Sequence, residues 1–170
     1  MKIPCSVKEA LAFNKENGNS KWDKAVKLET KSLNDLACFG FKPKGYLSGG
    51  KYKKTTLMII MNVKQDLRHK CQLVTGGNIV NDLHHDIYST TVKSISKKIL
   101  QVIAHKANLN ILCGDIGNAY TNGYTKKKVY AIAEDEFGKE MRGKIVIIKR
   151  ALYGLRKSSE RWYSYLSDTL

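Results

Sequence analysis

Three absences in this sequence each argue against a class of protein. The longest purely apolar runs, residues 57–61 and 145–148, are far shorter than the roughly 20 residues that a membrane-spanning helix needs. The N-terminus lacks the apolar centre of a signal peptide. The four cysteines are far apart and form no Cys-x-x-Cys pair, so neither a zinc site nor a disulfide framework is indicated. We therefore expect an intracellular protein, cytoplasmic or nuclear, that makes no membrane contact.

Acidic residues are also scarce. The chain has 15 Asp and Glu against 30 Lys and Arg, which gives a formal net charge of +15 and favours a polyanionic partner, with nucleic acid as the leading candidate. The basic residues are spread over residues 42–54, 93–98, 126–128 and 139–157, as expected for a cleft lined by several elements. For any single run, a solvated lysine-rich surface is the simpler interpretation.

The apolar pattern predicts a mixed α and β fold. At 170 residues with 42% hydrophobic residues, the chain suffices for one ordinary domain with a core. Helices are predicted at residues 7–13, 20–38 and 91–106 and from residue 158 onward, and strands at residues 55–64, 69–75, 129–133 and 144–149. The first two strands are joined by a short turn, which predicts a hairpin.

Three of the predicted helices have a clear apolar face. In the second helix these apolar positions are Trp22, Ala25, Val26, Leu33 and Leu36, and in the third they are Val92, Ile95, Ile99, Val102 and Ile103. In the last helix they are Trp162, Tyr165 and Leu166, and we expect these three to be buried. Ser20 is a candidate cap for the second helix. The last helix keeps its apolar spacing to Leu170 without a capping Gly or Pro, so we expect the fold to be cut within this element and to be marginally stable.

The most informative segment surrounds Asp115. It follows an apolar run, residues 109–113, that predicts a buried strand, so its carboxylate is expected to face solvent at the strand exit. Two-metal phosphoryl transfer needs a carboxylate on a rigid element, with an aromatic such as Tyr120 nearby to shape a nucleotide pocket. The alternative is that Asp115 caps the next turn. His84, His85 and Asp86 are interpreted as a polar connector, since adjacent side chains diverge.

A second motif, Ala-Leu-Tyr-Gly-Leu-Arg at residues 151–156, follows at a fitting distance. Together with Asp115-x-x-x-Ala119-Tyr120, it resembles the reverse transcriptase domain of copia-type long-terminal-repeat retrotransposons. The likeness covers nearly the whole chain and is less specific in the first 60 residues. It includes residues 8–11, Trp22 with Ala25, residues 68–74, Tyr88-Ser89-x-x-Val92-Lys93, Asn122, and residues 128–130 and 136–138.

The resemblance implies an α+β fold: the fingers and partial palm of a right-hand polymerase, with a mixed, mostly antiparallel sheet and packed helices. Residues 1–50 would be a helical N-terminal lead-in, and residues 51–170 the fingers and partial palm. The helix at residues 91–106 is expected to lie against the strand that carries Asp115.

The resemblance also implies an activity, RNA-directed DNA synthesis with Mg²⁺ as cofactor. The partners would be an RNA or DNA template-primer and deoxynucleoside triphosphates. Asp115 would be the first catalytic metal ligand, and the carbonyl of Ile116 would touch the same ion. Tyr120 falls at the steric-gate position, where a ring excludes a 2′-hydroxyl. Its alternative role is a half-buried tyrosine at a strand end.

Four further residues would bind the nucleotide. Tyr153 and Gly154 would support the incoming nucleotide and the template base, with Gly allowing close backbone approach. Arg68 and Lys70 would contact the triphosphate, although a solvated strand edge explains them equally well. Gln72 stands where the family usually has arginine, which removes one positive charge.

One departure from the family pattern bears directly on catalysis. The family requires an aromatic-x-Asp-Asp motif downstream, and the sequence reaches Leu170 without it. One aspartate cannot hold two divalent ions against their mutual repulsion. We therefore expect this chain alone to be inactive. The alternatives are a nucleic-acid-binding module without catalysis and a non-functional translated remnant.

Overall fold

The computed structural model describes residues 2–47, 52–76, 92–155 and 157–169. Residues 84–86, interpreted above as a connector, lie outside these ranges. The elements in chain order are α1 (Val7–Glu16), α2 (Lys21–Asp35), β1 (Phe39–Lys42), β2 (Lys53–Lys54), β3 (Leu57–Val63), β4 (His69–Thr75), α3 (Ser94–Lys106), the 3₁₀ helix η2 (Ala119–Asn122), β5 (Tyr124–Ile132), the 3₁₀ helix η3 (Asp135–Phe137), β6 (Ile145–Arg150) and α4 (Ser158–Thr169).

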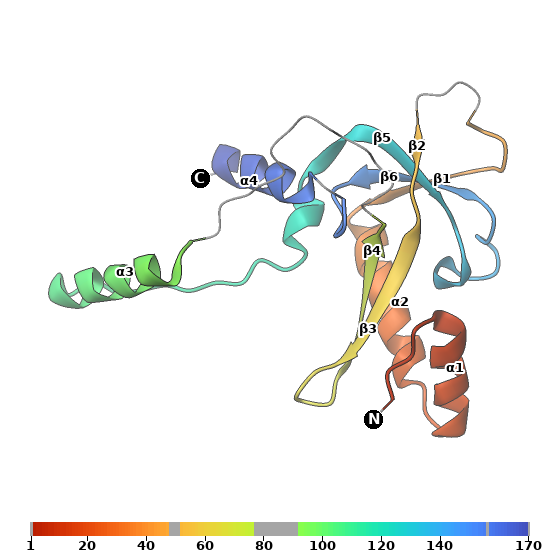
Figure 1. Cartoon of the computed structure of the whole chain (residues 1–170), viewed down its shortest axis with the longest axis horizontal. Coiled ribbons are helices and arrows are strands. Elements are labelled where there is room, and N and C mark those ends of the chain that lie inside the picture. Colours follow the sequence, from red (N-terminus) through yellow and green to blue (C-terminus); the bar gives the residue numbers. More distant parts are fainter. Residues whose placement is uncertain (1, 48–51, 77–91, 156, 170) are drawn as a thin grey trace.

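The strands form two sheets (Figure 1). A four-stranded sheet has the order β1-β6-β5-β2, with antiparallel pairs except between β2 and β5, which are parallel. β3 and β4 form a separate antiparallel hairpin, as the sequence predicts. The α+β class and the mixed, mostly antiparallel pairing are thus confirmed.

Two apolar clusters hold these layers together. The larger lies between α2, β4 and the four-stranded sheet, and its largest fully buried side chains are Leu73, Val129, Val146, Ile148 and Leu152. The smaller joins α1, α2 and the hairpin through Ala10, Trp22, Ala25, Val26, Met61 and Cys71. The apolar face predicted for the second helix is therefore confirmed, because Trp22, Ala25, Val26 and Leu33 are all buried.

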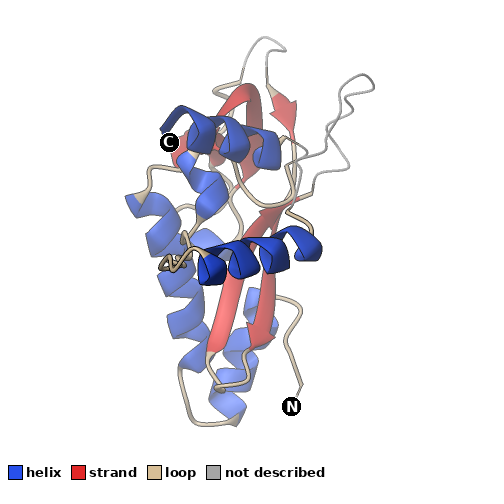
Figure 2. Ribbon diagram, turned by 90° about the vertical axis from the view of Figure 1, so that its left-hand side faces the viewer, coloured by secondary structure: helices blue, strands red, loops and turns tan. Residues whose placement is uncertain are grey.

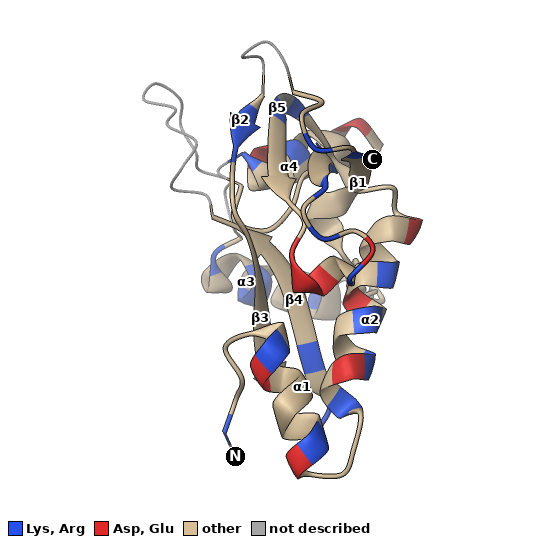
Figure 3. Cartoon of the chain, turned by 90° about the vertical axis from the view of Figure 1, so that its right-hand side faces the viewer, with Lys and Arg blue, Asp and Glu red and all other residues tan. Residues whose placement is uncertain are grey.

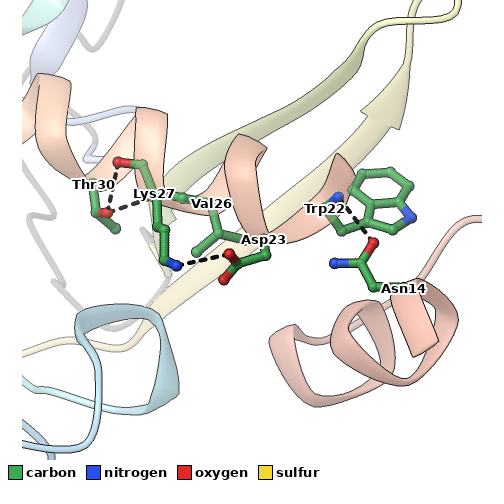
Figure 4. A network of polar contacts seen from close by, with 6 residues as sticks. All are labelled: Asn14, Trp22, Asp23, Val26, Lys27 and Thr30. Atoms are coloured by element: carbon green, nitrogen blue, oxygen red, sulfur yellow. Dashed lines mark hydrogen bonds and ion pairs between the residues drawn. The ribbon is translucent and has the colours of Figure 1, made fainter. Parts of the chain in front are cut away.

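The start of α2 is held by asparagines, and Ser20 makes no side-chain capping bond there. The Trp22 N–H donates to Oδ1 of Asn14, a buried residue of α1, at 3.1 Å (Figure 4). The Lys21 N–H donates to Oδ1 of Asn19 at 3.1 Å. The prediction that the Ser20 side chain caps this helix is therefore wrong. Asn14 and Asn19 instead supply acceptors for N–H groups of the first turn, which have no partner within the helix.

The prediction for residues 109–113 is wrong. These residues form no strand, and Leu112 is 98% exposed. The helix before them, α3, projects from the rest of the chain in Figure 1 and lies nearest the viewer in Figure 2. Its apolar face does not pack against a strand, since the side chains of Ile95, Ile99 and Ile103 are each more than half exposed. The expected packing of this helix against a strand that carries Asp115 is therefore also wrong, because no such strand forms.

The burial predicted for the last helix holds only in part. Trp162 and Leu166 of α4 are half-buried, whereas Tyr165 is 44% exposed. Trp162 stacks on Tyr165 with ring centroids 6.0 Å apart. Across the described parts of the chain, no helix is both long and apolar enough to span a membrane.

Candidate active site

Asp115 lies in the loop between α3 and η2, and its side chain is exposed. Ile116, the next residue, is 51% exposed. Three residues after Asp115 the loop is attached to the body of the protein, because Nδ2 of Asn118 donates to Oγ of Ser32 on α2 at 2.8 Å. Asn118 has a left-handed backbone (φ 52°), which turns the chain into η2. The loop therefore presents Asp115 at the solvent-facing end of a fixed turn.

The turn of η2 brings Tyr120 against Tyr153. Their ring centroids are 4.7 Å apart and the rings are tilted by 53°. Both side chains are half-buried. Burial raises the pKa of Tyr153 above its usual value, and Tyr120, Glu29 and Asp115 raise it further, in that order. The charge of Asp115 thus contributes to the raised pKa of Tyr153.

Gly154 connects this pair to the end of β4. Its φ of +90° is a left-handed conformation that favours glycine, and a Cβ at this position would overlap the carbonyl oxygen of Thr75. The contact is reinforced by Thr75, whose N–H donates to the Tyr153 carbonyl at 2.8 Å and whose hydroxyl donates to the same oxygen at 3.1 Å. As predicted, position 154 needs glycine because the backbone makes a close approach there. The neighbour is the protein backbone of Thr75.

Arg68 and Lys70 lie elsewhere. Arg68 is in the turn of the hairpin, where its Nε pairs with Oδ2 of Asp66 at 2.6 Å. Hydrogen bonds from Arg68, first from its backbone N–H and then from its side chain, lower the pKa of Asp66. Lys70 is exposed on β4. A strand rises about 3.3 Å per residue, so about 20 Å of β4 separates its first residue, beside Arg68, from Thr75. The structure therefore gathers Asp115, Tyr120, Tyr153 and Gly154, and leaves these two cations at the far end of the hairpin.

Comparison with known proteins identifies the family. Residues 51–170 match the family described as reverse transcriptase (RNA-dependent DNA polymerase). The chain belongs to the reverse transcriptase family. It is 27% identical to the Transposon Ty1-BL Gag-Pol polyprotein of Saccharomyces cerevisiae over 95% of its own length and 9% of that protein. Identity to the Ty1-DR4 polyprotein of the same yeast is also 27%, over 95% of this chain and 10% of the relative.

These relatives agree with the copia-type resemblance, and the chain spans about a tenth of their length. No solved structure matches it.

Sequence reasoning missed two residues of this candidate site. The first is Arg150, whose guanidinium donates to the carbonyls of Thr121 and Asn122, each at 3.2 Å, and lies 4.4 Å from the ring centroid of Tyr124. It therefore fixes the far end of η2 and, with it, Tyr120. Its position directly before the motif at residues 151–156 was the available signal.

The second is Glu29 of α2. One of its carboxylate oxygens accepts the Leu73 N–H of β4 at 3.0 Å. Burial raises the pKa of this carboxyl, while the bond from Leu73 and then the charge of Lys70 lower it. The signal was present in the sequence, because Glu29 falls at the helical spacing of Trp22, Val26 and Leu33, where an apolar residue is expected.

The described residues do not fit a complete magnesium site. Across these residues, no three His, Cys, Asp or Glu side chains are grouped so that they could hold a metal ion. Asp115 with one backbone carbonyl supplies only part of the six-oxygen shell of Mg²⁺, and a pair of ions needs more anionic ligands.

Proposed function

We propose that this chain forms the fingers and the first part of the palm of a right-hand polymerase, residues 51–170, preceded by a helical lead-in at residues 1–50. In the intact transposon protein this unit takes part in RNA-directed DNA synthesis on an RNA or DNA template-primer. The observation that carries the proposal is the convergence of Asp115, the Tyr120–Tyr153 pair and Gly154 at the junction of η2 and β4.

Tyr120 selects the sugar of the incoming deoxynucleoside triphosphate. Its half-buried ring is held by Tyr153 on one side and by the η2 turn that Arg150 fixes, so it cannot move aside freely. A rigid ring beside the sugar excludes a 2′-hydroxyl. Gly154 keeps the backbone of this loop against β4, and Tyr153 with Gly154 forms the floor under the nucleotide.

Asp115 and the carbonyl of Ile116 are metal ligands in the intact polymerase, where Mg²⁺ is the expected ion. The exposure of both residues leaves them accessible to an ion and to further ligands. Because the described residues hold one part of the ligand set, we expect no synthesis by this chain alone. Arg68 and Lys70 are proposed triphosphate contacts, and their distance from Tyr153 requires the hairpin to bend toward the site when nucleotide binds.

A chimaera tests this function. The segment that follows the matching region in the Ty1-BL polyprotein is joined after residue 170, and extension of oligo(dT) on poly(rA) is measured. The chimaera should extend the primer, whereas Asp115→Asn should reduce the rate by about 100-fold or more, the scale for loss of a catalytic group. Asp168→Asn, on exposed α4, is the matched control and should extend normally. Full extension by the Asp115→Asn chimaera would refute the role of Asp115.

A second candidate function is nucleic-acid binding without catalysis. The observation that favours it is the single carboxylate of the proposed catalytic set, combined with a net charge of +15. In that case a chimaera with intact Asp115 binds primer-template and extends nothing.

A further inference from the structure

The four-stranded sheet has a second face, opposite to the one that the larger apolar cluster covers. Across the sheet, Val129, Ile148 and Phe39 are paired neighbours, and all three are buried in the larger apolar cluster. The next row consists of Lys54, Tyr130, Ile147 and Gly40, paired in that order from β2 to β1. Because side chains alternate between the faces of a strand, this second row lies on the opposite face. There Lys54 is exposed and Tyr130 and Ile147 are half-buried.

Lysines share this face with Tyr130, and Lys54 is its register partner on β2. Lys149 follows Ile147 by two residues and so shares its face, and its side chain is exposed. It lies across Gly40, since a Cβ added there would come within 2.8 Å of its Cε. At the edges, Lys42 Nζ is 4.8 Å from the ring centroid of Tyr46, and Lys128 Nζ is 5.8 Å from that of Tyr52. The surface thus interleaves cations with tyrosine rings.

Within the described residues, the strands of this sheet, β1, β2, β5 and β6, supply no acidic side chain that would neutralise the positive charge of this face. Lys42, Lys54, Lys128 and Lys149 form no ion pair with any part of the chain that the structure describes. The helices differ, because acidic and basic side chains alternate along α1 and α2 in Figure 3, and Lys27 pairs with Asp23 at 2.7 Å.

We propose that this sheet face, called here the basic face and defined by Lys42, Lys54, Lys128, Tyr130 and Lys149, binds single-stranded nucleic acid. Unpaired lysines bind phosphates by releasing counterions, and the open part of a tyrosine ring stacks on bases of any sequence. A lipid surface would also attract the lysines, but half-buried Tyr130 and Ile147 offer little apolar side chain to insert between acyl chains. The ring and cation pattern therefore favours nucleic acid.

The basic face is distinct from the candidate active site. Tyr124 at the start of β5 pairs with Arg150 and Tyr130 pairs with Ile147, so three residues of β6, about 10 Å, lead from one to the other. None of the residues proposed for metal or nucleotide contact belongs to the basic face. Binding there requires neither Asp115 nor a metal ion, so the two proposals can fail separately.

Fluorescence anisotropy with a labelled single-stranded oligonucleotide of about 12 nucleotides, within the site size of comparable surfaces, tests the proposal. Lys54→Glu/Lys149→Glu should weaken binding by about tenfold or more and reduce the slope of log K against log salt concentration by about 1.4, roughly 0.7 for each phosphate of a single strand that the variant no longer neutralises. Lys15→Glu/Lys24→Glu makes the same charge change at exposed positions on α1 and α2 and should alter affinity by less than about threefold.

Two further measurements keep the outcome decisive. Lys54→Gln/Lys149→Gln removes the two charges without reversing them, and it should also lower the affinity and the salt slope. It replaces the charge-reversal variant if that variant folds poorly. Tyr130→Leu should weaken binding severalfold with an unchanged salt slope, because this change removes stacking and leaves the charges in place. Equal losses in the helix and sheet variants would overturn the proposal. So would sheet-dependent binding to phosphatidylcholine–phosphatidylserine vesicles without binding to the oligonucleotide.

Discussion

Gly154 determines how closely the loop after β6 approaches the hairpin. Its neighbour is the backbone of Thr75, which cannot rotate away as a flexible side chain could. Thr75 also donates two hydrogen bonds to the carbonyl of Tyr153, the residue before Gly154. Backbone packing of this kind couples the position of Tyr153, and therefore of Tyr120, to the end of β4.

Gly154→Ala should therefore destabilise the chain strongly. A left-handed backbone alone costs about 1 kcal/mol for alanine, and the overlap with Thr75 adds a further loss, so we expect at least about 3 kcal/mol in total. Gly143→Ala is the matched control, because Gly143 has φ of +80° and open space around its Cβ position. Urea unfolding measures both. Similar losses in the two variants would show that the Thr75 contact is not a constraint.

Glu29 should make stability depend on pH. Burial raises the pKa of this carboxyl above its ordinary value of 4.5, so between the two values the folded chain binds more protons than the unfolded chain. The stability contribution of Glu29 is fully present below pH 4.5 and is lost as pH rises through the folded pKa. Glu29→Gln keeps an acceptor for the Leu73 N–H and should be more stable than the parent at pH 7, with the difference shrinking toward pH 4.

The check is urea unfolding at several pH values. Glu16→Gln, exposed on α1, serves as control and should show no comparable trend. A Glu29→Gln variant that is less stable than the parent at neutral pH would contradict the sign of this effect.

At this scale, motifs named the residues that are proposed to carry chemistry but not those that hold them in place. Asp115, Tyr120 and Gly154 stand in recognisable local patterns. Arg150 and Glu29 act on groups far along the chain, the carbonyls of η2 and the N–H of Leu73, and no local pattern names such a partner.

Elements whose pairing or apolar face can be recognised within a short stretch of sequence were predicted well. The β3–β4 hairpin closes locally, and α2 has an apolar stripe long enough to identify its face. β1 was missed because a four-residue strand at residues 39–42 depends on β6 for its hydrogen bonds. Residues 109–113 were misassigned for the converse reason, since an apolar run without a neighbouring strand stays irregular.

The junction of α1 and α2 offers a test at the element scale. Asn14→Ala removes the buried acceptor of the Trp22 N–H and should destabilise the chain by about 1–2 kcal/mol. Asn17→Ala removes an exposed bond to the Phe13 carbonyl and should cost about 0.5 kcal/mol or less. Thermal unfolding followed by circular dichroism compares the two variants. An Asn14 variant as stable as the Asn17 variant would show that the cap is dispensable.

For the whole molecule, the most consequential surface is the apolar face of α3. Val92, Ile95, Ile99, Val102 and Ile103 are each more than half exposed, and Leu109 and Leu112 continue this surface into the loop. Contiguous apolar surface of this extent drives association. We therefore expect the isolated chain to self-associate through α3.

Ile99→Glu/Ile103→Glu should reduce this association and shift the chain toward monomer in sedimentation velocity runs over a range of concentrations. Ser96→Glu/Gln101→Glu introduces the same charge on exposed polar positions of α3 and should leave the distribution unchanged. Identical behaviour of both double variants would place the association surface elsewhere.

The strand order also affects the way the chain is made. β6 is the central strand that pairs with both β1 and β5, and Phe39 meets Ile148 across more than half the chain. The hairpin and α2 are complete long before that, since their contacts are local. During synthesis from the N-terminus, β2 waits unpaired until residues 124–132 emerge, and β1 until residues 145–150 emerge. The four-stranded sheet, and the lysines it aligns, therefore form only near the end of translation of this segment.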